Sequence, residues 1–264
     1  AGAGDNAAGA LGVGVTEPGQ AFISLGTSGV FFVVSDSHRA SPENTVHAFC
    51  HCLPQRWHQM SVSLSAANSL AWFASLMQIP VDDLLAELET SGITKTPVQF
   101  LPYLSGERTP HNDPKATGCF FGMTSHTKRP HLTLAVLEGV AYSFADGLAA
   151  LDAAGSYVQD ITLIGGGARS ALWRQLLADV LNRQLTFRDG GEIGPALGAA
   201  RLAMLGYLID AGDKFDSQLL ASVCPIPALV AKHVPNADRH AYSRHQLEKY
   251  RALYQCTRAL NTNN

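Results

Sequence analysis

Apolar and polar residues follow two different periods along the chain, and the change between them predicts where strands give way to helices. Runs rich in β-branched and aromatic residues predict strands at Ala21–Leu25, Val30–Val34, Val46–His51, Trp57–Met60, Cys119–Phe121, Ile161–Ile164 and Gln184–Phe187. Apolar residues at helical spacing predict helices over Ser63–Met77, Pro80–Leu88, Leu132–Leu151, Ser170–Leu181, Pro195–Leu208 and Arg239–Leu260. Hairpin strands followed by alternating strands and helices predict an α/β fold, with helices packed on a mixed β-sheet.

The composition is that of an ordinary globular domain. The chain has 264 residues, of which 46% are hydrophobic and 16% charged, and its formal net charge is −3. Its Lys and Arg residues are scattered, which argues against a dedicated nucleic-acid surface. No uninterrupted apolar run reaches the roughly 18 residues of a membrane-spanning helix, so we expect no membrane association and a cytoplasmic protein. The Gly/Ala-rich start, Ala1–Gly14, has no initiator Met and suggests a fragment or a processed product.

A short cluster of histidines and cysteines raises the question of a metal site. His47, Cys50, His51 and Cys52 are residue types that bind zinc. In an extended segment, however, His51 points away from the face that Cys50 and Cys52 share, and no second pair of ligands lies nearby. The odd cysteine count of 5 fits a reducing compartment. We therefore predict an ordinary strand and no metal ligands, with a small metal- or redox-responsive protein as an alternative function class.

Glycine-rich turns are the candidate ligand sites. The sequence has neither the G-x-x-x-x-G-K-[ST] phosphate loop nor the G-x-S-x-G hydrolase motif. Gly26–Gly29 places two hydroxyl residues between glycines, which suits phosphate contacts but also a plain hairpin turn. Gly165–Ser170 lies between a buried strand and a helix, where the helix N-terminus attracts negative charge. Three consecutive glycines there indicate close approach of a ligand, whereas Gly190–Gly191 is more typical of a turn.

Asp5 has two possible roles. It lies between Gly4 and Asn6 in the Gly/Ala-rich start, where an Asp is commonly an Asx-turn or helix-cap residue. A positioned carboxylate can also accept the proton of a substrate hydroxyl, as in protein kinases. The local sequence leaves both roles open.

A resemblance to a known family rests on longer motifs. Gly118–Met123, followed by Pro130–Glu138, resembles the second signature of the FGGY carbohydrate kinase family. The segments that resemble its xylulokinases are GAGDNAAGA (Gly2–Ala10), SLGTSGV (Ser24–Val30), PYLSGERTPHNDP (Pro102–Pro114), LIGGGARS (Leu163–Ser170) and GPALGAARLA (Gly194–Ala203). The similarity covers nearly the whole chain and becomes thin only beyond about Gly206.

The resemblance implies a fold and a set of site residues. Residues 1–264 would be the C-terminal nucleotide-binding domain of a sugar kinase, with an actin-like, ribonuclease-H-type fold. Asp5 would be the catalytic base and contact the sugar together with Asn6. The ATP site would comprise Gly26, Thr27, Ser28 and Gly29 at the phosphates, Gly166, Gly167, Ala168 and Ser170 at the adenosine, and Gly122 near the nucleotide. Glu107 and Arg108 lie in a similar loop without an implied role, so a surface ion pair or a loop-ordering contact is expected.

The resemblance also implies an activity. The complete protein would transfer phosphate from ATP, with Mg²⁺, to a pentulose, converting D-xylulose to D-xylulose 5-phosphate. An N-terminal domain absent from this chain would supply most sugar contacts, so the chain alone should be inactive. The apolar face that meets this domain could also form a homodimer. The alternatives are a kinase for a related ketose or polyol and a non-enzymatic actin-like nucleotide-binding module.

Overall fold

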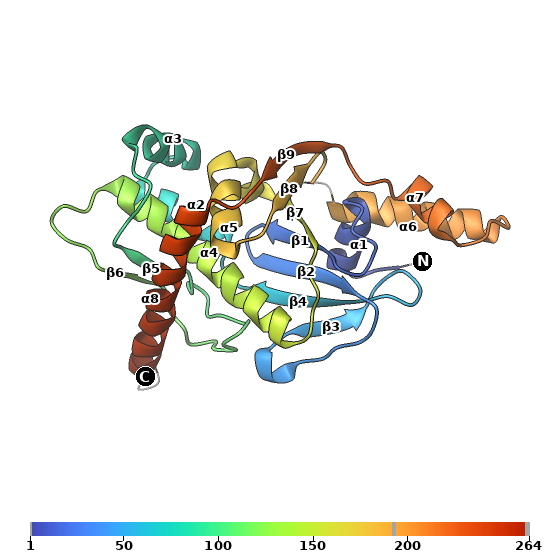
Figure 1. The fold of residues 1–264 in the computed structure, drawn as a ribbon, viewed down its shortest axis with the longest axis horizontal. Coiled ribbons are helices and arrows are strands. Elements are labelled where there is room, and N and C mark those ends of the chain that lie inside the picture. Colours follow the sequence, from blue (N-terminus) through green and yellow to red (C-terminus); the bar gives the residue numbers. More distant parts are fainter. Residues whose placement is uncertain (1, 192–193, 262–264) are drawn as a thin grey trace.

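A seven-stranded mixed β-sheet organises the fold (Figure 1). The computed structural model describes residues 2–191 and 194–261. The strands of the sheet are β1 (Gln20–Leu25), β2 (Gly29–Ser35), β3 (His47–Cys50), β4 (Trp57–Ser63), β7 (Asp160–Ile164), β8 (Leu185–Arg188) and β9 (Leu229–His233). Their order is β3-β4-β2-β1-β7-β8-β9, and β1 pairs antiparallel with β2 but parallel with β7. The predicted α/β class with a mixed sheet is therefore confirmed.

Every predicted strand and helix is present, with bounds shifted by a few residues. The helices are α1 (Asp5–Gly12), α2 (Ala67–Met77), α3 (Val81–Ser91), α4 (Arg129–Ala153), α5 (Ala171–Leu181), α6 (Gly194–Asp210), α7 (Ser217–Val223) and α8 (Ala237–Asn261). Strands β5 (Gln99–Leu101) and β6 (Cys119–Phe121) form a separate pair, and η1 (Pro42–Asn44) and η2 (Gly166–Arg169) are short 3₁₀ helices. Helix α2 begins later than predicted because Ser63 belongs to β4. Ala1 and residues 262–264 of the expected 1–264 domain lie outside the described residues.

The sequence did not predict α1, β5, α7 or β9. The glycines of α1 disfavour a helix by propensity, and the helix is stabilised by its tertiary packing. Strand β9 lies at the exposed edge of the sheet and has no buried residue, so it lacks the alternating pattern of a half-buried strand.

Alternate residues of the central strands enter two different cores. Ala21, Ile23 and Leu25 of β1 pack with α2, α4, α5 and α8 on one face of the sheet. Phe22, between them, packs on the other face with α1, and its ring stacks on that of Phe32 with centroids 4.8 Å apart. The period of two along these strands therefore determines which helices each residue contacts.

Helix α4 is the central helix of the larger core. By length and composition alone it could cross a membrane, with a mean hydropathy of 1.4 over its most apolar window. Glu138 and Asp146 interrupt the apolar sequence of this helix, so it contains no uninterrupted apolar run of that length. In the fold, 89% of that window is buried. Glu138 and Asp146 form ion pairs with Arg239 and Arg251 of α8, so they tie α4 to α8.

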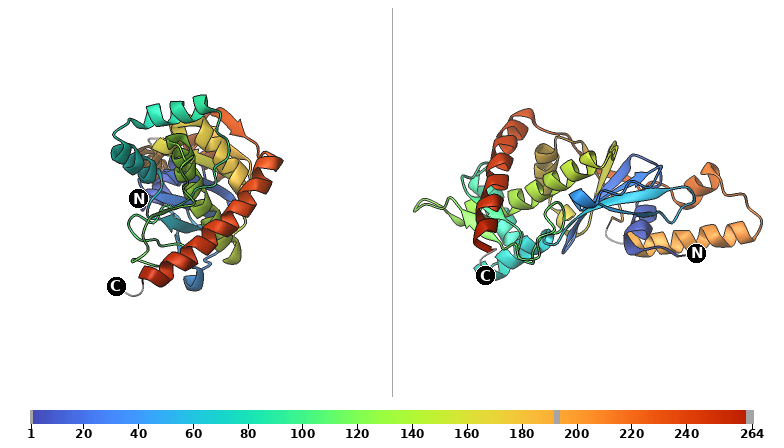
Figure 2. Two further views of the ribbon diagram at one scale, coloured as in Figure 1. Left: turned by 90° about the vertical axis from the view of Figure 1, so that its left-hand side faces the viewer. Right: turned by 90° about the horizontal axis from the view of Figure 1, so that it is seen from below.

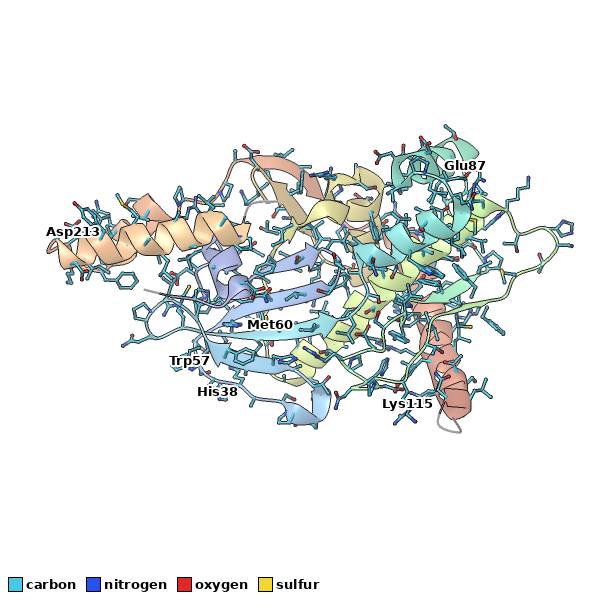
Figure 3. All side chains as sticks on the ribbon, turned by 180° about the vertical axis from the view of Figure 1, so that it is seen from behind. His38, Trp57, Met60, Glu87, Lys115 and Asp213 are labelled. Carbon is cyan, nitrogen blue, oxygen red and sulfur yellow. The ribbon has the colours of Figure 1, made fainter. Side chains whose placement is uncertain are left out.

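Helices α6 and α7 project from the body as an arm (Figures 1 and 2). Asp213 lies at the far end of the arm (Figure 3). The first half of α6 packs against α1 at glycine contacts. A Cβ atom at Gly12 would lie 1.9 Å from the carbonyl oxygen of Gly194, and one at Gly198 would lie 1.6 Å from that of Ala8. Only glycine at Gly12 and Gly198 allows this approach, so α6 determines where α1 lies.

Two buried histidines lie against Phe32 of β2. His51 and His58 are 6% and 5% exposed, with ring centroids 5.9 Å apart. Burial lowers the pKa of His51 to about 3 and that of His58 to about 4. The Cys52 thiol lies 3.6 Å from Nδ1 of His51 and 3.6 Å from the Ala7 carbonyl oxygen. Across residues 2–191 and 194–261, no group of three or more His, Cys, Asp and Glu side chains could hold a metal ion.

Replacing His58 with Phe should make the protein less sensitive to acid. An unfolded histidine has a pKa of about 6.5, whereas folded His58 titrates near 4. The unfolded state therefore takes up a proton that the folded state does not, and stability falls as the pH drops below about 6.5. Between pH 7 and 5, the free energy of unfolding of the parent should fall by about 1–2 kcal/mol more than that of the variant.

Urea denaturation of parent and variant at each pH measures this difference. The pKa of Glu107 is raised, so this residue makes the protein more stable as the pH falls, opposite to His58. Because Glu107 is present in both proteins, its contribution cancels when parent and variant are compared at the same pH. His126 is exposed, so His126→Phe should leave the pH dependence unchanged. Equal pH dependence in the parent and His58→Phe would contradict the assignment of a buried neutral ring.

Candidate functional site

Two glycine-rich turns meet at one edge of the sheet because β1 and β7 run parallel. Gly26–Ser28 connects β1 to β2 and forms the tip of their hairpin, which we call the phosphate hairpin. Gly165 and η2 follow the carboxyl end of β7. The predicted hairpin turn is confirmed, and the carboxyl ends of adjacent parallel strands are a common place for a ligand site in α/β proteins.

Packing on β1 explains two of the three consecutive glycines. Gly165 has φ of +88°, and a Cβ there would lie 2.9 Å from the Leu25 carbonyl group. A Cβ on Gly167 would lie 2.6 Å from Cγ of Leu25. Gly166 alone faces open space, with nothing within 4 Å of a Cβ placed on it. The expectation that a ligand is needed to explain all three glycines is therefore wrong, and only Gly166 lacks a structural reason.

The larger of two cavities at this edge has a volume of about 740 Å³. The glycine turn and the start of α5 form one wall, and α2 and α3 form the other. The lining residues are Leu25, Gly26, Thr27, Ala67, Asn68, Leu70, Ala71, Val81, Asp82, Leu85, Ala86, Glu89, Gly166, Gly167, Arg169, Ser170, Ala171 and Trp173. Ser170 also caps α5 by accepting a hydrogen bond from the Trp173 amide at 3.2 Å. A cavity lined by both apolar and polar side chains suits a small organic molecule.

The smaller cavity, of about 300 Å³, lies on the other side of the phosphate hairpin. Its lining residues are Asp5, Asn6, Gly9, Phe22, Ser24, Gly26, Thr27, Ser28, Val30, Ile164, Gly165, Gly191 and Pro195. Gly26 and Thr27 line both cavities, so the hairpin tip is where the two meet. A ligand that occupies both would pass over Gly26 and Thr27.

Asp5 is the first residue of α1 and lines the smaller cavity with an exposed side chain. Its Oδ1 accepts hydrogen bonds from the backbone amide of Asn6 at 2.8 Å and from the Asn6 side-chain amide at 3.2 Å. The positive end of the α1 dipole also favours a carboxylate there. The structure therefore holds an accessible carboxylate near the phosphate hairpin.

Three predicted site residues line neither cavity. Gly29 is the first residue of β2, where a Cβ would lie 2.7 Å from the Phe144 ring, so packing requires glycine there. Ala168 is 0% exposed. Gly122 has φ of +88° and is exposed at the end of β6, where a Cβ would lie 3.0 Å from the Pro97 carbonyl oxygen. Their part in nucleotide binding stays a prediction.

The sequence did not predict the wall opposite the glycine turn. Asn68 on α2 and Asp82 and Glu89 on α3 line the larger cavity as the polar residues of amphipathic helices. Their sequence pattern is that of any solvent-exposed helix face, so no spacing distinguishes them. Gly191, assigned to a turn from the sequence, lines the smaller cavity.

Glu107 lines neither cavity, and only 2% of its surface is exposed. Its carboxylate accepts hydrogen bonds from Oγ of Ser63 at 2.8 Å and from the backbone amides of Leu64 and Arg108 at 2.9 and 2.7 Å. Burial raises its pKa to about 7, against the lowering effect of these bonds. Of the two expected contacts, a surface ion pair or a loop-ordering contact, the structure shows the second, because the buried Glu107 side chain bonds to Ser63, Leu64 and Arg108 inside the protein.

A family model and similar relatives point to the same family of proteins. Residues 21–207 match the FGGY family of carbohydrate kinases, C-terminal domain. The chain is 51% identical over 256 residues to the xylulose kinase of Escherichia coli K12 and 48% identical over 254 residues to that of Klebsiella pneumoniae. These alignments cover 97% and 96% of this chain but 51% of each relative. The chain thus spans about half the length of the curated relatives that it matches.

A solved structure matches the fold over almost the whole chain. The crystal structure of a xyloylose kinase from Brucella ovis superimposes with a TM-score of 0.89 at 42% sequence identity, covering 98% of this chain and 52% of that one. The actin-like fold that the resemblance implied is thereby confirmed. From the matched domain, the sequence identity and the shared fold, the chain belongs to the FGGY family of carbohydrate kinases.

Proposed function

We propose that the chain is the C-terminal, nucleotide-binding half of an ATP-dependent pentulose kinase that converts D-xylulose to D-xylulose 5-phosphate. The observation that carries the proposal is that two cavities meet at Gly26 and Thr27, with Asp5 in the smaller one. This arrangement suits a ligand with an organic body at one end and a reacting phosphate at the other. The relatives named xylulose kinase support the choice of sugar.

We assign a role to each part of the site. The base and ribose would lie in the larger cavity between Gly166 and the α2–α3 wall. The phosphates would pass over the phosphate hairpin, whose backbone amides and the hydroxyls of Thr27 and Ser28 can donate hydrogen bonds. Asp5 would accept the proton of the sugar hydroxyl as that hydroxyl attacks the terminal phosphate. Catalysis would then depend on positioning and charge stabilisation, without a covalent enzyme intermediate.

Mg²⁺ fits this site as part of a metal–nucleotide complex. Mg²⁺ bound with a nucleotide needs only one or two protein carboxylates, because phosphate oxygens and water supply its other ligands. Among the described residues that line the smaller cavity, Asp5 carries a carboxylate. When bound, the ion would neutralise phosphate charge.

The rest of the kinase would come from a partner half. An N-terminal domain would supply the remaining sugar contacts, close the cleft and exclude water. We expect this chain alone to bind ATP without transferring phosphate to a sugar. Cytoplasmic localisation and homodimer formation also stay predictions.

A coupled assay of ADP release by the intact two-domain protein tests the function. D-xylulose should be phosphorylated with a larger kcat/KM than D-ribulose, glycerol or gluconate. Preference for one of the other three would make the protein a kinase for a related ketose, polyol or sugar acid. ATP binding without turnover on any of them would support the non-enzymatic module instead.

Filling the larger cavity should weaken nucleotide binding. Ala86 is exposed on α3 and lines this cavity. The indole of Ala86→Trp would occupy the space assigned to the nucleoside, so the Kd for ADP should rise at least about tenfold, or roughly 1.4 kcal/mol. Isothermal titration calorimetry measures this. Asp83→Trp places the same ring on α3 outside the cavity and should leave the Kd unchanged; equal effects of the two variants would contradict the assigned cavity.

A further inference from the structure

We propose that Glu107 is a positioning residue for the phosphate hairpin. It lies in the loop to which neither the sequence nor the proposed reaction assigns a role, and it contacts neither cavity. The inference rests on the proposed function, since it assigns the hairpin to ATP. It adds that the orientation of the hairpin is maintained by a buried carboxylate that lines neither cavity and lies 80 residues after Thr27 in the sequence.

The first step is the contact between Glu107 and the corner that joins β4 to α2. We call this corner, residues 63–68, the β4–α2 corner. Oε2 of Glu107 accepts the hydroxyl of Ser63 at 2.8 Å, and Oε1 accepts the Leu64 amide at 2.9 Å. The Ser63 hydroxyl is also 3.1 Å from that of Ser143 on α4. Glu107 therefore fixes the first two residues of the corner against the core.

The second step connects the corner to the hairpin. The amides of Ala66 and Asn68 donate to the Thr27 carbonyl oxygen at 3.0 and 3.4 Å, and the Ala67 amide donates to that of Gly26 at 2.8 Å. The first amides of a helix have no partner within the helix, and α2 has no side-chain cap. The hairpin carbonyls thus cap α2, and in return the start of α2 fixes the two peptide groups that line both cavities.

The third step is the rigidity of the loop that carries Glu107. The Glu107 amide donates to the Asp113 carbonyl oxygen at 2.9 Å, and the Asp113 amide donates to the Glu107 carbonyl oxygen at 2.8 Å. The Thr109 amide donates to the Val62 carbonyl oxygen at 3.0 Å, and the Thr109 hydroxyl accepts from the Val62 amide at 3.1 Å. Thr109 also donates to the Thr45 carbonyl oxygen at 3.0 Å. Because Thr109 is bound to β4 and Asp113 pairs with Glu107, Glu107 is held by the fold rather than by its own side-chain preference.

A displaced hairpin would affect ATP more than sugar. A misplacement of about 1 Å in a group that positions the reacting phosphate can cost about 100-fold in rate. The Glu107 contacts converge on Gly26 and Thr27, whereas Asp5 is positioned by α1 and α6. Loss of the carboxylate should therefore act on nucleotide binding and on kcat, and should leave the KM for the sugar unchanged.

Two substitutions of Glu107 in the intact kinase test this role. Glu107→Gln keeps Oε1 as the acceptor for both amides, and its Nε2 can donate to the Ser63 hydroxyl, so it should retain the parent KM for ATP. Glu107→Ala removes all three contacts and should raise the KM for ATP and the Kd for ADP at least about tenfold, with a lower kcat. The KM for D-xylulose should not change. Arg108→Ala, at the exposed neighbour, should match the parent throughout.

The outcomes separate this inference from the proposed function. Calorimetric binding of ADP tests the role of Glu107 even if the parent phosphorylates no sugar, a result that would contradict only the proposed function. Unchanged ADP binding in Glu107→Ala, or an equal loss in Arg108→Ala, would overturn the positioning role. If Glu107→Ala does not fold, Ser63→Ala removes the Ser63 contact alone. It should then raise the KM for ATP in the same direction, and parent-like kinetics would contradict the inference.

Discussion

Replacing Asp5 with Asn should lower kcat of the intact kinase by about 10²–10⁴-fold, the usual contribution of a positioned general base. The amide of Asn has nearly the same shape as the carboxylate but cannot accept the hydroxyl proton. The larger cavity does not include Asp5, so the Kd for ATP should change little. Steady-state kinetics with D-xylulose, together with calorimetric titration of ATP, measures both quantities.

A matched substitution distinguishes catalysis from a general loss of charge. Asp160 is exposed at the start of β7 and lines neither cavity, so Asp160→Asn should keep the parent kcat. If Asp5→Asn also kept its kcat, Asp5 would be only the first residue of α1 and the proposed mechanism would fail. A loss of ATP binding in Asp5→Asn would instead indicate a structural or phosphate-contacting role.

Replacing Gly198 with Ala should destabilise the protein, although Gly→Ala in an open helix position usually stabilises by about 0.4–1 kcal/mol. The new Cβ would lie 1.6 Å from the carbonyl oxygen of Ala8, a backbone atom that cannot move without moving α1. We expect the free energy of unfolding to fall by about 1–3 kcal/mol, the usual cost of overpacking. Because α1 carries Asp5, kcat should fall as well.

An Ala-to-Gly substitution at an exposed position of α6 separates the effect of helix propensity from the effect of close packing against α1. Ala203 is exposed on α6, so Ala203→Gly should cost about 1 kcal/mol through helix propensity alone and leave kcat unchanged. Urea denaturation and steady-state kinetics of both variants provide the comparison. A stabilised Gly198→Ala protein with full activity would show that α1 and α6 do not pack as closely as described.

The fold could be predicted where apolar residues form continuous runs or recur at helical spacing. The strands β1, β2 and β7 bury almost every residue, and α4 and α5 have clear apolar faces, so their patterns were informative. Helix α1 could not be predicted, because its stability depends on Gly12 and Gly198 meeting residues far away in the sequence. Local propensity contains no information on such contacts.

The site was predictable only in part for a similar reason. The glycine turns and Asp5 lie in motifs that can be read locally, and the structure brings them to one edge of the sheet. The α2–α3 wall and Glu107 have ordinary local sequences, and their positions depend on tertiary packing. Gly29 and Gly167 also have a packing reason, against Phe144 and Leu25, that the local sequence does not show.

A crystal structure of the intact protein with D-xylulose and a non-hydrolysable ATP analogue tests the central claim most directly. The account predicts the adenine between Gly166 and the α2–α3 wall, phosphates at Gly26 and Thr27, and a sugar hydroxyl within hydrogen-bonding distance of Asp5, about 2.6–3.2 Å. A nucleotide bound outside the larger cavity, or a sugar far from Asp5, would contradict it.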